Sequence, residues 1–395
     1  MEEIACPGFK AAGVAAGLKK NGHKDVGIIF SETPAAIAGV FTKNKVKASC
    51  VRLCQERITS GKAQAIIANS GNANCCTGDR GMRDTMELSA LVSQHLGIND
   101  EAVFVASTGV IGVPLPVDKI KSAVPHLIGA LSENGFSDFA ESIMTTDTSR
   151  KIISRQGRVD GKRFTVTGIA KGSGMICPDM ATMLCFVCSD IGASPDVLNK
   201  ILSRAVDKSF NKITVDGDTS TNDMALIMSN GLSEIELTRT SHMDAFQNEL
   251  DVVLKGLARE IVKDGEGATK LVEIEIKGAL SDEDARLAAE TVAHSSLVKT
   301  ALFGQDANWG RIIAAVGRAG IHIDQDRIDI YFDNVKAVSD GARSSHASAE
   351  QDATRVLRKP EFTITVDLNI GQGSAAILTC DFSVDYVKIN ADYRT

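Results

Sequence analysis

A glycine-containing turn in the middle of the chain leads to a threonine and then to a strand-like run. Gly172 and Gly174 lie in the turn, and Thr182 precedes the apolar segment 183–187. The Thr182 hydroxyl could attack the carbonyl of Ala181, and collapse of the adduct would leave Thr182 as a new N-terminus. Its free α-amino group would titrate near ~8 and could accept the hydroxyl proton, which activates a weak nucleophile. The sequence thus offers self-cleavage followed by acyl-transfer chemistry.

The same residues have a simpler interpretation. Gly172 and Gly174 can merely turn the chain before a buried strand that begins at Thr182, because glycine turns before strands are common. A dinucleotide loop is excluded, since Cys177 stands where the third glycine should be and Pro178 would disturb the helix that should open there.

Residues that could bind a metal lack the required pattern. Asp216, Asp218 and Ser220 imitate the start of a calcium loop. However, Thr221 replaces its turn glycine and Ile227 its closing glutamate. The nine cysteines and seven histidines show no zinc spacing, and the one C-x-x-C motif lies in an apolar run. We expect buried, reduced thiols and no metal dependence.

The elements that must position these residues alternate between strands and helices. The chain has 395 residues, 44% of them hydrophobic, which is enough for two domains or two large halves. Periodicity predicts strands and helices in both halves, and no linker marks a clean border. The expected strands are 26–30, 63–68, 102–106, 183–187, 271–276, 328–332, 362–368 and 375–380, and the expected helices are 83–96, 117–131, 195–206, 244–263 and 282–298.

Charge is unevenly distributed along the chain. Residues 1–181 contain 21 Lys and Arg against 17 Asp and Glu, whereas residues 182–395 contain 22 against 33, which gives +4 and −11 and the total of −7. Opposite signs would help two fragments stay together. We find no basic run typical of nucleic-acid binding, no secretory start and no membrane-spanning apolar run. We therefore expect a cytoplasmic protein without nucleic-acid or membrane partners.

Seven sequence blocks, spread from one end of the chain to the other, form an ordered set. They are 71–74, 107–112, 171–184, 213–223, 264–270, 306–311 and 390–395. Together they resemble the ornithine acetyltransferase family of arginine biosynthesis, often called ArgJ. One glycine motif would be weak evidence, but seven motifs in family order are specific. The pattern of elements by itself supports only mixed α and β, whereas the resemblance implies an α+β fold, a layered α/β/β/α sandwich of the N-terminal-nucleophile-like type.

The resemblance implies a reaction and an assembly. A precursor of that family cleaves itself before the threonine, here into an α chain of residues 1–181 and a β chain of residues 182–395, which form a heterotetramer. The new threonine takes acetyl from N2-acetyl-L-ornithine, releases L-ornithine and passes the acetyl group to L-glutamate, giving N-acetyl-L-glutamate. No cofactor is needed. Some members also use acetyl-CoA, and the resemblance leaves this open here.

Functional positions of the family fall on particular residues of this chain. Thr182 corresponds to the nucleophile, and Thr108 and Gly109 to the oxyanion hole, whose donors face the charge that develops during acyl transfer. The substrate-binding positions fall on Thr145, Lys171, Thr182, Glu266, Asn390 and Thr395. Taken singly, Thr108 could be a helix cap, Lys171 a loop lysine and Glu266 part of a turn.

The chain departs from the family pattern close to the expected cleavage bond. Asp179 stands where members commonly have Asn, three residues before Thr182. An added carboxylate could slow self-cleavage or shift its pH dependence, and we expect the precursor still to process. Two other classes of protein stay open. One is an N-terminal-nucleophile amidohydrolase or aminopeptidase that passes the acyl group to water. The other is a binding protein in which 171–184 is only a turn.

Overall fold

The chain folds into two compact units, each a mixed sheet covered by helices. The computed structural model describes residues 5–20, 22–177 and 183–392. The first unit combines Met1–Asn211 with Asp218–Ile261, and the second combines Lys212–Gly217 with Val262–Thr395. The expectation of a layered α+β architecture is confirmed. The boundary between the units does not coincide with the expected cleavage bond.

The first unit is built on an eight-stranded mixed sheet. The strand order is β4-β3-β2-β8-β7-β6-β5, and β1 pairs with β2 at the side. β7 and β8 run parallel and are buried along their whole length, as is typical of parallel strands covered on both faces. The strands are β1 (Phe9–Val14), β2 (Val26–Phe41), β3 (Lys62–Asn69), β4 (Val103–Ser107), β5 (Lys151–Val159), β6 (Lys162–Lys171), β7 (Leu184–Ser189) and β8 (Met224–Ser229).

Two features of this sheet position the expected site. The long strand β2 changes partners along its length: its first part pairs with β3 and its last part with β8, with a register shift between Phe30 and Ala35. β6 and β7 are adjacent and antiparallel, and Lys171 lies opposite Leu184. The expected cleavage bond is therefore part of the connection between two neighbouring strands, and the strands on both sides of it belong to one sheet.

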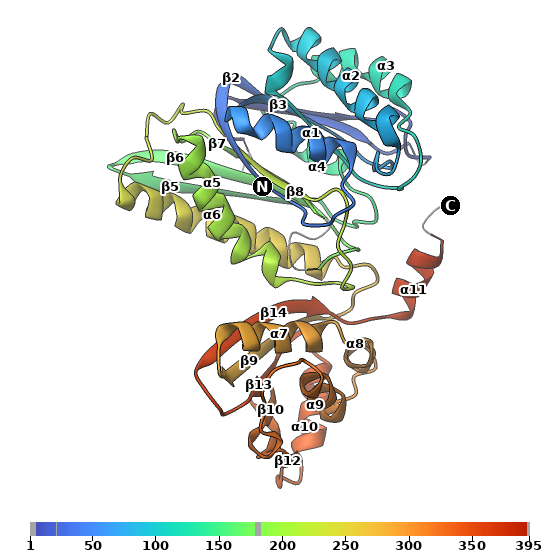
Figure 1. The fold of residues 1–395 in the computed structure, drawn as a ribbon, viewed down its shortest axis with the longest axis vertical. Helices are drawn as coiled ribbons and strands as arrows, with labels where there is room; N and C mark the ends of the chain where they lie inside the picture. Colours follow the sequence, from blue (N-terminus) through green and yellow to red (C-terminus); the bar gives the residue numbers. More distant parts are fainter. Residues whose placement is uncertain (1–4, 21, 178–182, 393–395) are drawn as a thin grey trace. The chain divides into compact units, whose positions relative to one another are not determined.

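Six helices pack on this sheet (Figure 1). α1 and α2 contact β4, α3 and α4 contact β1 and β2, and α5 contacts β2. α6 lies along β5 and β6, where a Cβ atom on Gly168 would come within 2.6 Å of Val253 and 2.8 Å of Leu257. The helices are α1 (Ser49–Arg57), α2 (Gly78–Leu96), α3 (Val117–Gly129), α4 (Phe136–Ser142), α5 (Pro195–Asp207) and α6 (Thr240–Lys263).

The second unit has a six-stranded mixed sheet in the order β12-β11-β10-β13-β9-β14. α7 packs on β9 and β14, and α10 packs on β10 and β11. The strands are β9 (Leu271–Ala279), β10 (Asp329–Phe332), β11 (Val335–Ser339), β12 (Ala342–Arg343), β13 (Glu361–Asp367) and β14 (Gly373–Cys380). The helices are α7 (Asp282–Ala293), α8 (Ser296–Phe303), α9 (Trp309–Gly317), α10 (Ala349–Leu357) and α11 (Val384–Ala391).

One expected element is wrong. The segment predicted as a single helix over 282–298 forms two helices, because α7 ends at Ala293 and α8 begins at Ser296. The Ser295 hydroxyl accepts the backbone N–H of Val298 at 3.4 Å, and such a cap starts a new helix rather than continuing the old one. Among the described residues, no helix has the length and apolar character needed to span a bilayer.

Candidate active site

The Thr108–Gly109 segment follows directly after β4 and is fixed by its backbone. The Thr108 N–H donates to the Asn69 carbonyl at 2.9 Å, and isolated bridges join Asn72 to Thr108 and to Val110. Thr108 is buried, and no hydrogen bond involves its hydroxyl within the part of the chain that the structure describes. That hydroxyl is thus available to an incoming group.

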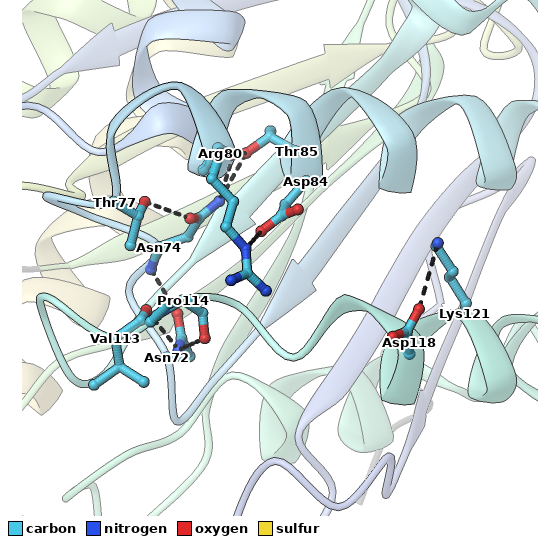
Figure 2. Close-up of polar contacts among 11 residues, drawn as sticks. Asn72, Asn74, Thr77, Arg80, Asp84, Thr85, Val113, Pro114, Asp118 and Lys121 are labelled. Carbon is cyan, nitrogen blue, oxygen red and sulfur yellow. Dashed lines mark hydrogen bonds and ion pairs between the residues drawn. The ribbon is translucent and has the colours of Figure 1, made fainter.

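Gly109 occupies a position that an ordinary residue could not. Its φ of +130° lies in the region that favours glycine. A Cβ atom there would come within 2.4 Å of the Gly71 carbonyl carbon and 2.6 Å of the Asn72 nitrogen. Asn72 is itself fixed, since its side-chain amide donates to the carbonyls of Val113 (3.1 Å) and Pro114 (3.2 Å), as Figure 2 shows. The two loops that meet here are therefore closely packed and rigid.

A buried amide, Asn222, connects this loop to the centre of the sheet. Its Nδ2 donates to the Ser107 carbonyl and to the Ala73 carbonyl, both at 2.7 Å. Its Oδ1 accepts the hydroxyl of Thr221 at 2.6 Å. Ser107 is the residue directly before Thr108, so Asn222 fixes the peptide that leads into the expected oxyanion hole.

The next residue, Asp223, fixes the backbone directly after the expected nucleophile. Its Oδ1 accepts the Met183 N–H at 3.0 Å, while its buried Oδ2 has no hydrogen-bond partner among the described residues. Burial raises the pKa of the Asp223 carboxyl well above its usual range, although the Met183 and Ser220 hydrogen bonds and the charge of Lys171 oppose that rise. The carboxyl therefore keeps its proton to a higher pH than an ordinary aspartate.

We predict that Asp223 is needed as a hydrogen-bond acceptor rather than as a charge. Asp223→Asn keeps an acceptor for the Met183 N–H and should cleave at nearly the parental rate. Asp223→Leu leaves that N–H buried without a partner, which should cost about 1–3 kcal/mol of stability and lengthen the half-time of self-cleavage. Intact mass measured over time after synthesis checks both variants. Equal slowing of the two would contradict the prediction.

Lys171 and Thr145 lie together on a buried carboxylate, Asp147. Lys171 Nζ donates to the Thr145 hydroxyl at 2.9 Å and lies 3.8 Å from Asp147 Oδ2. Asp147 Oδ1 accepts from Lys151 Nζ at 2.9 Å and from the Gly172 N–H at 2.7 Å. The structure thus brings two of the expected substrate-binding residues into contact.

Two ammonium groups bring the Asp147 carboxyl to an unusual pKa. Burial by itself would raise the pKa of Asp147, but Lys171 and Lys151 outweigh burial and bring it well below its usual range. Lys19 lies near the cluster, and burial lowers its pKa to about 8 against the opposing charges of Asp25, Asp147 and Glu141. The ammonium group of Lys171 is a suitable partner for an anion such as a substrate carboxylate.

Asp147→Asn should be strongly destabilising. The change removes the carboxylate that both Lys151 and Lys171 contact, and breaking a buried ion pair costs about 3–5 kcal/mol. Because the folded-state pKa is depressed, Asp147 stabilises the protein above its unfolded pKa near ~4, and this stability is lost as the pH falls. Urea unfolding from pH 7 down to acid should therefore show a steeper acid loss in the parent. Parallel curves for the two proteins would exclude this role.

In the second unit, two further expected residues are hydrogen-bonded to each other. Asn390 Nδ2 on α11 donates to Glu266 Oε2 at 2.8 Å. The loop that carries Glu266 is fixed to the start of α11, because the Ser383 hydroxyl donates to the Gly267 carbonyl at 2.6 Å. Both the start and the last turn of α11 are therefore hydrogen-bonded to the loop that carries Glu266.

Several expected positions lie outside the described residues. They are Ala181, Thr182, Thr395 and the divergent Asp179. Asp147, Asn222 and Asp223 were not expected as site residues. Asn222 and Asp223 belong to the block 213–223, whose acidic residues there suggested only a rejected calcium loop. A buried hydrogen-bonding role has no signature in sequence spacing.

The chain is similar in sequence to known proteins along almost its whole length. A model described as the ArgJ family matches residues 10–395. The arginine biosynthesis bifunctional protein ArgJ of Geobacter sulfurreducens is 52% identical over 390 residues, which cover 98% of this chain and 99% of that protein. The protein of the same name from Bacillus anthracis is 45% identical over 391 residues, covering 98% of this chain and 95% of its own.

The crystal structure of arginine biosynthesis bifunctional protein argJ from Bacillus halodurans has 41% sequence identity and a TM-score of 0.49, and the match covers 52% of this chain and 97% of that chain. On its full-length similarity in sequence, this chain belongs to the ArgJ family.

Proposed function

We propose that this protein is an acetyltransferase of arginine biosynthesis that moves acetyl from N2-acetyl-L-ornithine to L-glutamate through an acetyl-Thr182 intermediate. The observation that carries the proposal is family membership over residues 10–395. The relatives bear the name arginine biosynthesis bifunctional protein, which supports acetyl-CoA as a second donor. The pair Asn222–Asp223 supports the assignment of residues, because it ties the expected oxyanion loop to the backbone next to Thr182.

Each half-reaction uses the same groups. The Thr182 hydroxyl attacks the acetyl carbonyl of N2-acetylornithine, and its proton passes to the Thr182 α-amino group. The amide C–N bond breaks as that proton is delivered to the departing amine of ornithine. The amine of glutamate then attacks the acetyl ester, the ester C–O bond breaks, and a proton returns to the threonine oxygen. The Thr108 hydroxyl and the Gly109 N–H stabilise both oxyanions, at ~3 kcal/mol for each donor.

Substrate binding is assigned to the clusters of the two units, each argued by itself. Lys171 and Thr145 would bind a substrate carboxylate, a role that the hydrogen bond from Lys171 Nζ to the Thr145 hydroxyl supports, because it places both donors side by side. Glu266 would bind the side-chain ammonium of ornithine, and its hydrogen bond from Asn390 orients the carboxylate for that role. Thr182 and Thr395 complete the proposed set.

The mature protein would consist of an α chain, 1–181, and a β chain, 182–395, that assemble as a heterotetramer. Sheet pairing supports the lasting association of the fragments after cleavage, because β7 pairs with β6 and β8 pairs with β2. Strands from both fragments would then share one continuous set of hydrogen bonds. Their charges of opposite sign add to this association.

The transferase is distinguished from a hydrolase by the fate of the acetyl group. We expect release of ornithine from N2-acetylornithine to depend on glutamate and to be matched by N-acetylglutamate in equal amount. An enzyme checked for complete cleavage should be assayed with and without glutamate. Equal ornithine release in both assays, with acetate as the second product, would favour the amidohydrolase and overturn the proposal.

Lys171→Ala should mainly weaken substrate binding. Removing the ammonium group takes away a charge-assisted hydrogen bond to the substrate carboxylate, so we expect KM for N2-acetylornithine to rise about tenfold or more with a smaller change in kcat. Steady-state kinetics on the cleaved variant measure both constants. A loss of kcat at unchanged KM would instead assign Lys171 to the chemical step.

A further inference from the structure

A cavity with a strongly basic lining lies in the first unit, outside the clusters described above. Its volume is about 670 Å³, within the range of about 300–1,000 Å³ that is usual for small-molecule sites. Among the described residues that line it, none is acidic and four are cationic, namely Lys43, Lys45, Lys47 and Arg52. Such a lining selects a ligand with several negative charges.

The loop between β2 and α1 presents the lysines at every second position. The Asn44 N–H donates to the Thr42 hydroxyl at 3.1 Å, and Asn44 Oδ1 accepts the Val46 N–H at 2.9 Å. These bonds give the loop a fixed shape. Lys45 and Arg52 are exposed and form no ion pair within the described part of the chain, so no internal carboxylate neutralises them.

The N-terminus of α2 adds to the positive character of the cavity. Thr77 and Gly78 belong to its lining. The Thr77 hydroxyl donates to Asn74 Oδ1 at 2.9 Å, so it does not cap the helix, and Figure 2 shows Asn74 lying between Thr77 and Thr85. The start of a 19-residue helix thus belongs to the wall of the cavity, where its dipole would favour an anion, although Asp79 in its first turn offsets part of that effect.

Hydrogen bonds connect the walls of this cavity to the candidate active site. The Thr42 N–H donates to the Asp223 carbonyl at 3.0 Å, and the Ala48 N–H donates to the Thr221 carbonyl at 3.0 Å. Both ends of the lysine loop thus join the segment that contains Asn222. On the other wall, the Ser49 N–H donates to the Asn74 carbonyl at 3.3 Å, only two residues beyond Asn72, which adjoins Gly109.

We propose that this basic pocket binds the phosphate groups of acetyl-CoA, a proposal that rests on the acetyltransferase function above. N2-acetylornithine and glutamate carry no phosphate and do not need four cations. Acetyl-CoA carries a pyrophosphate and a phosphate monoester at one end and its thioester at the other end of a long flexible arm. A basic pocket connected to the acyl-transfer loop would bind the phosphate end of acetyl-CoA, and the flexible arm would let the thioester end reach that loop.

The test is a charge neutralisation with a matched control. The variant Lys45→Gln/Arg52→Gln removes two cations of the pocket. Lys200→Gln/Lys255→Gln removes two exposed cations elsewhere in the same unit. Titration calorimetry with CoA on the cleaved enzyme should show a Kd raised about tenfold or more in the first variant and unchanged in the second. In steady-state kinetics on the first variant, KM for acetyl-CoA should rise about tenfold more than KM for N2-acetylornithine.

Three results would contradict the proposal that this pocket binds the phosphate groups of acetyl-CoA. One is equal CoA affinity in parent and pocket variant, and another is an equal rise of both KM values. Absence of CoA binding by a parent that still transfers acetyl from N2-acetylornithine to glutamate would also overturn it, while the proposed function stands. If the parent binds CoA through these residues but does not transfer acetyl from N2-acetylornithine to glutamate, the proposed function is rejected and the pocket proposal stands.

Discussion

Thr182→Ala should leave the protein as one uncleaved chain with no measurable acetyl transfer. The change removes the hydroxyl that attacks the Ala181 carbonyl, and without cleavage no α-amino group is released to act as base. Loss of both groups should lower kcat by about 10⁴-fold or more, because nucleophile and base act as a unit. Intact mass shows the cleavage state, and ornithine release in the presence of glutamate shows the activity.

Thr182→Ser is the matched control for this experiment. Serine keeps the hydroxyl, so we expect cleavage at the same bond and retained transfer at a reduced rate. Brief incubation of the cleaved parent with N2-acetylornithine should place the acetyl group on the N-terminal peptide of the β chain. Full activity of an uncleaved Thr182→Ala chain, or an acetyl group stably bound to another residue during turnover, would refute the mechanism.

Gly109→Ala should reduce kcat by about 10²–10³-fold, the effect of losing one oxyanion donor. The new Cβ would meet the Gly71 carbonyl carbon at 2.4 Å, and the backbone φ of +130° is unsuited to alanine. The loop must therefore shift, and the Gly109 N–H shifts with it. Steady-state kinetics on cleaved protein measure the loss, and circular dichroism verifies that the variant is folded.

Gly112→Ala in the same loop provides the comparison. Gly112 also has a positive φ, +82°, but a Cβ atom there would meet nothing within 4 Å. That change should cost about 1–2 kcal/mol of backbone strain and leave kcat within a few-fold of the parent. If both variants lose activity equally, general strain in the loop explains the loss and the oxyanion assignment of Gly109 is wrong.

Sequence patterns predicted several of the elements that surround the site, but not β5 and β6, which carry Lys151 and Lys171. The strands at 63–68 and 102–106 and the helices at 83–96 and 195–206 are confirmed with small shifts at their ends. β8 was not predicted, because Met224–Ser229 is a short apolar run that periodicity cannot assign to a strand or a buried helix. The break between α7 and α8 was also missed, since a serine cap inside an apolar pattern gives a weak signal.

The sequence by itself determined the family and the mixed α and β architecture, because ordered motifs and periodicity depend only on residues close together in the chain. It also predicted Thr108, Gly109, Thr145 and Lys171 as site residues. Only the tertiary structure decided which distant residues meet. Asn222 contacts Ser107 across more than a hundred residues, and Asp147 joins Lys151 and Lys171 in one buried ion-pair cluster. The alternating lysines at 43, 45 and 47 form no basic run, and they become part of a polyanion pocket only where the fold places them beside Arg52 and the start of α2. The physical reason is that burial and hydrogen bonding depend on what surrounds a side chain in space, and spacing along the chain does not record it.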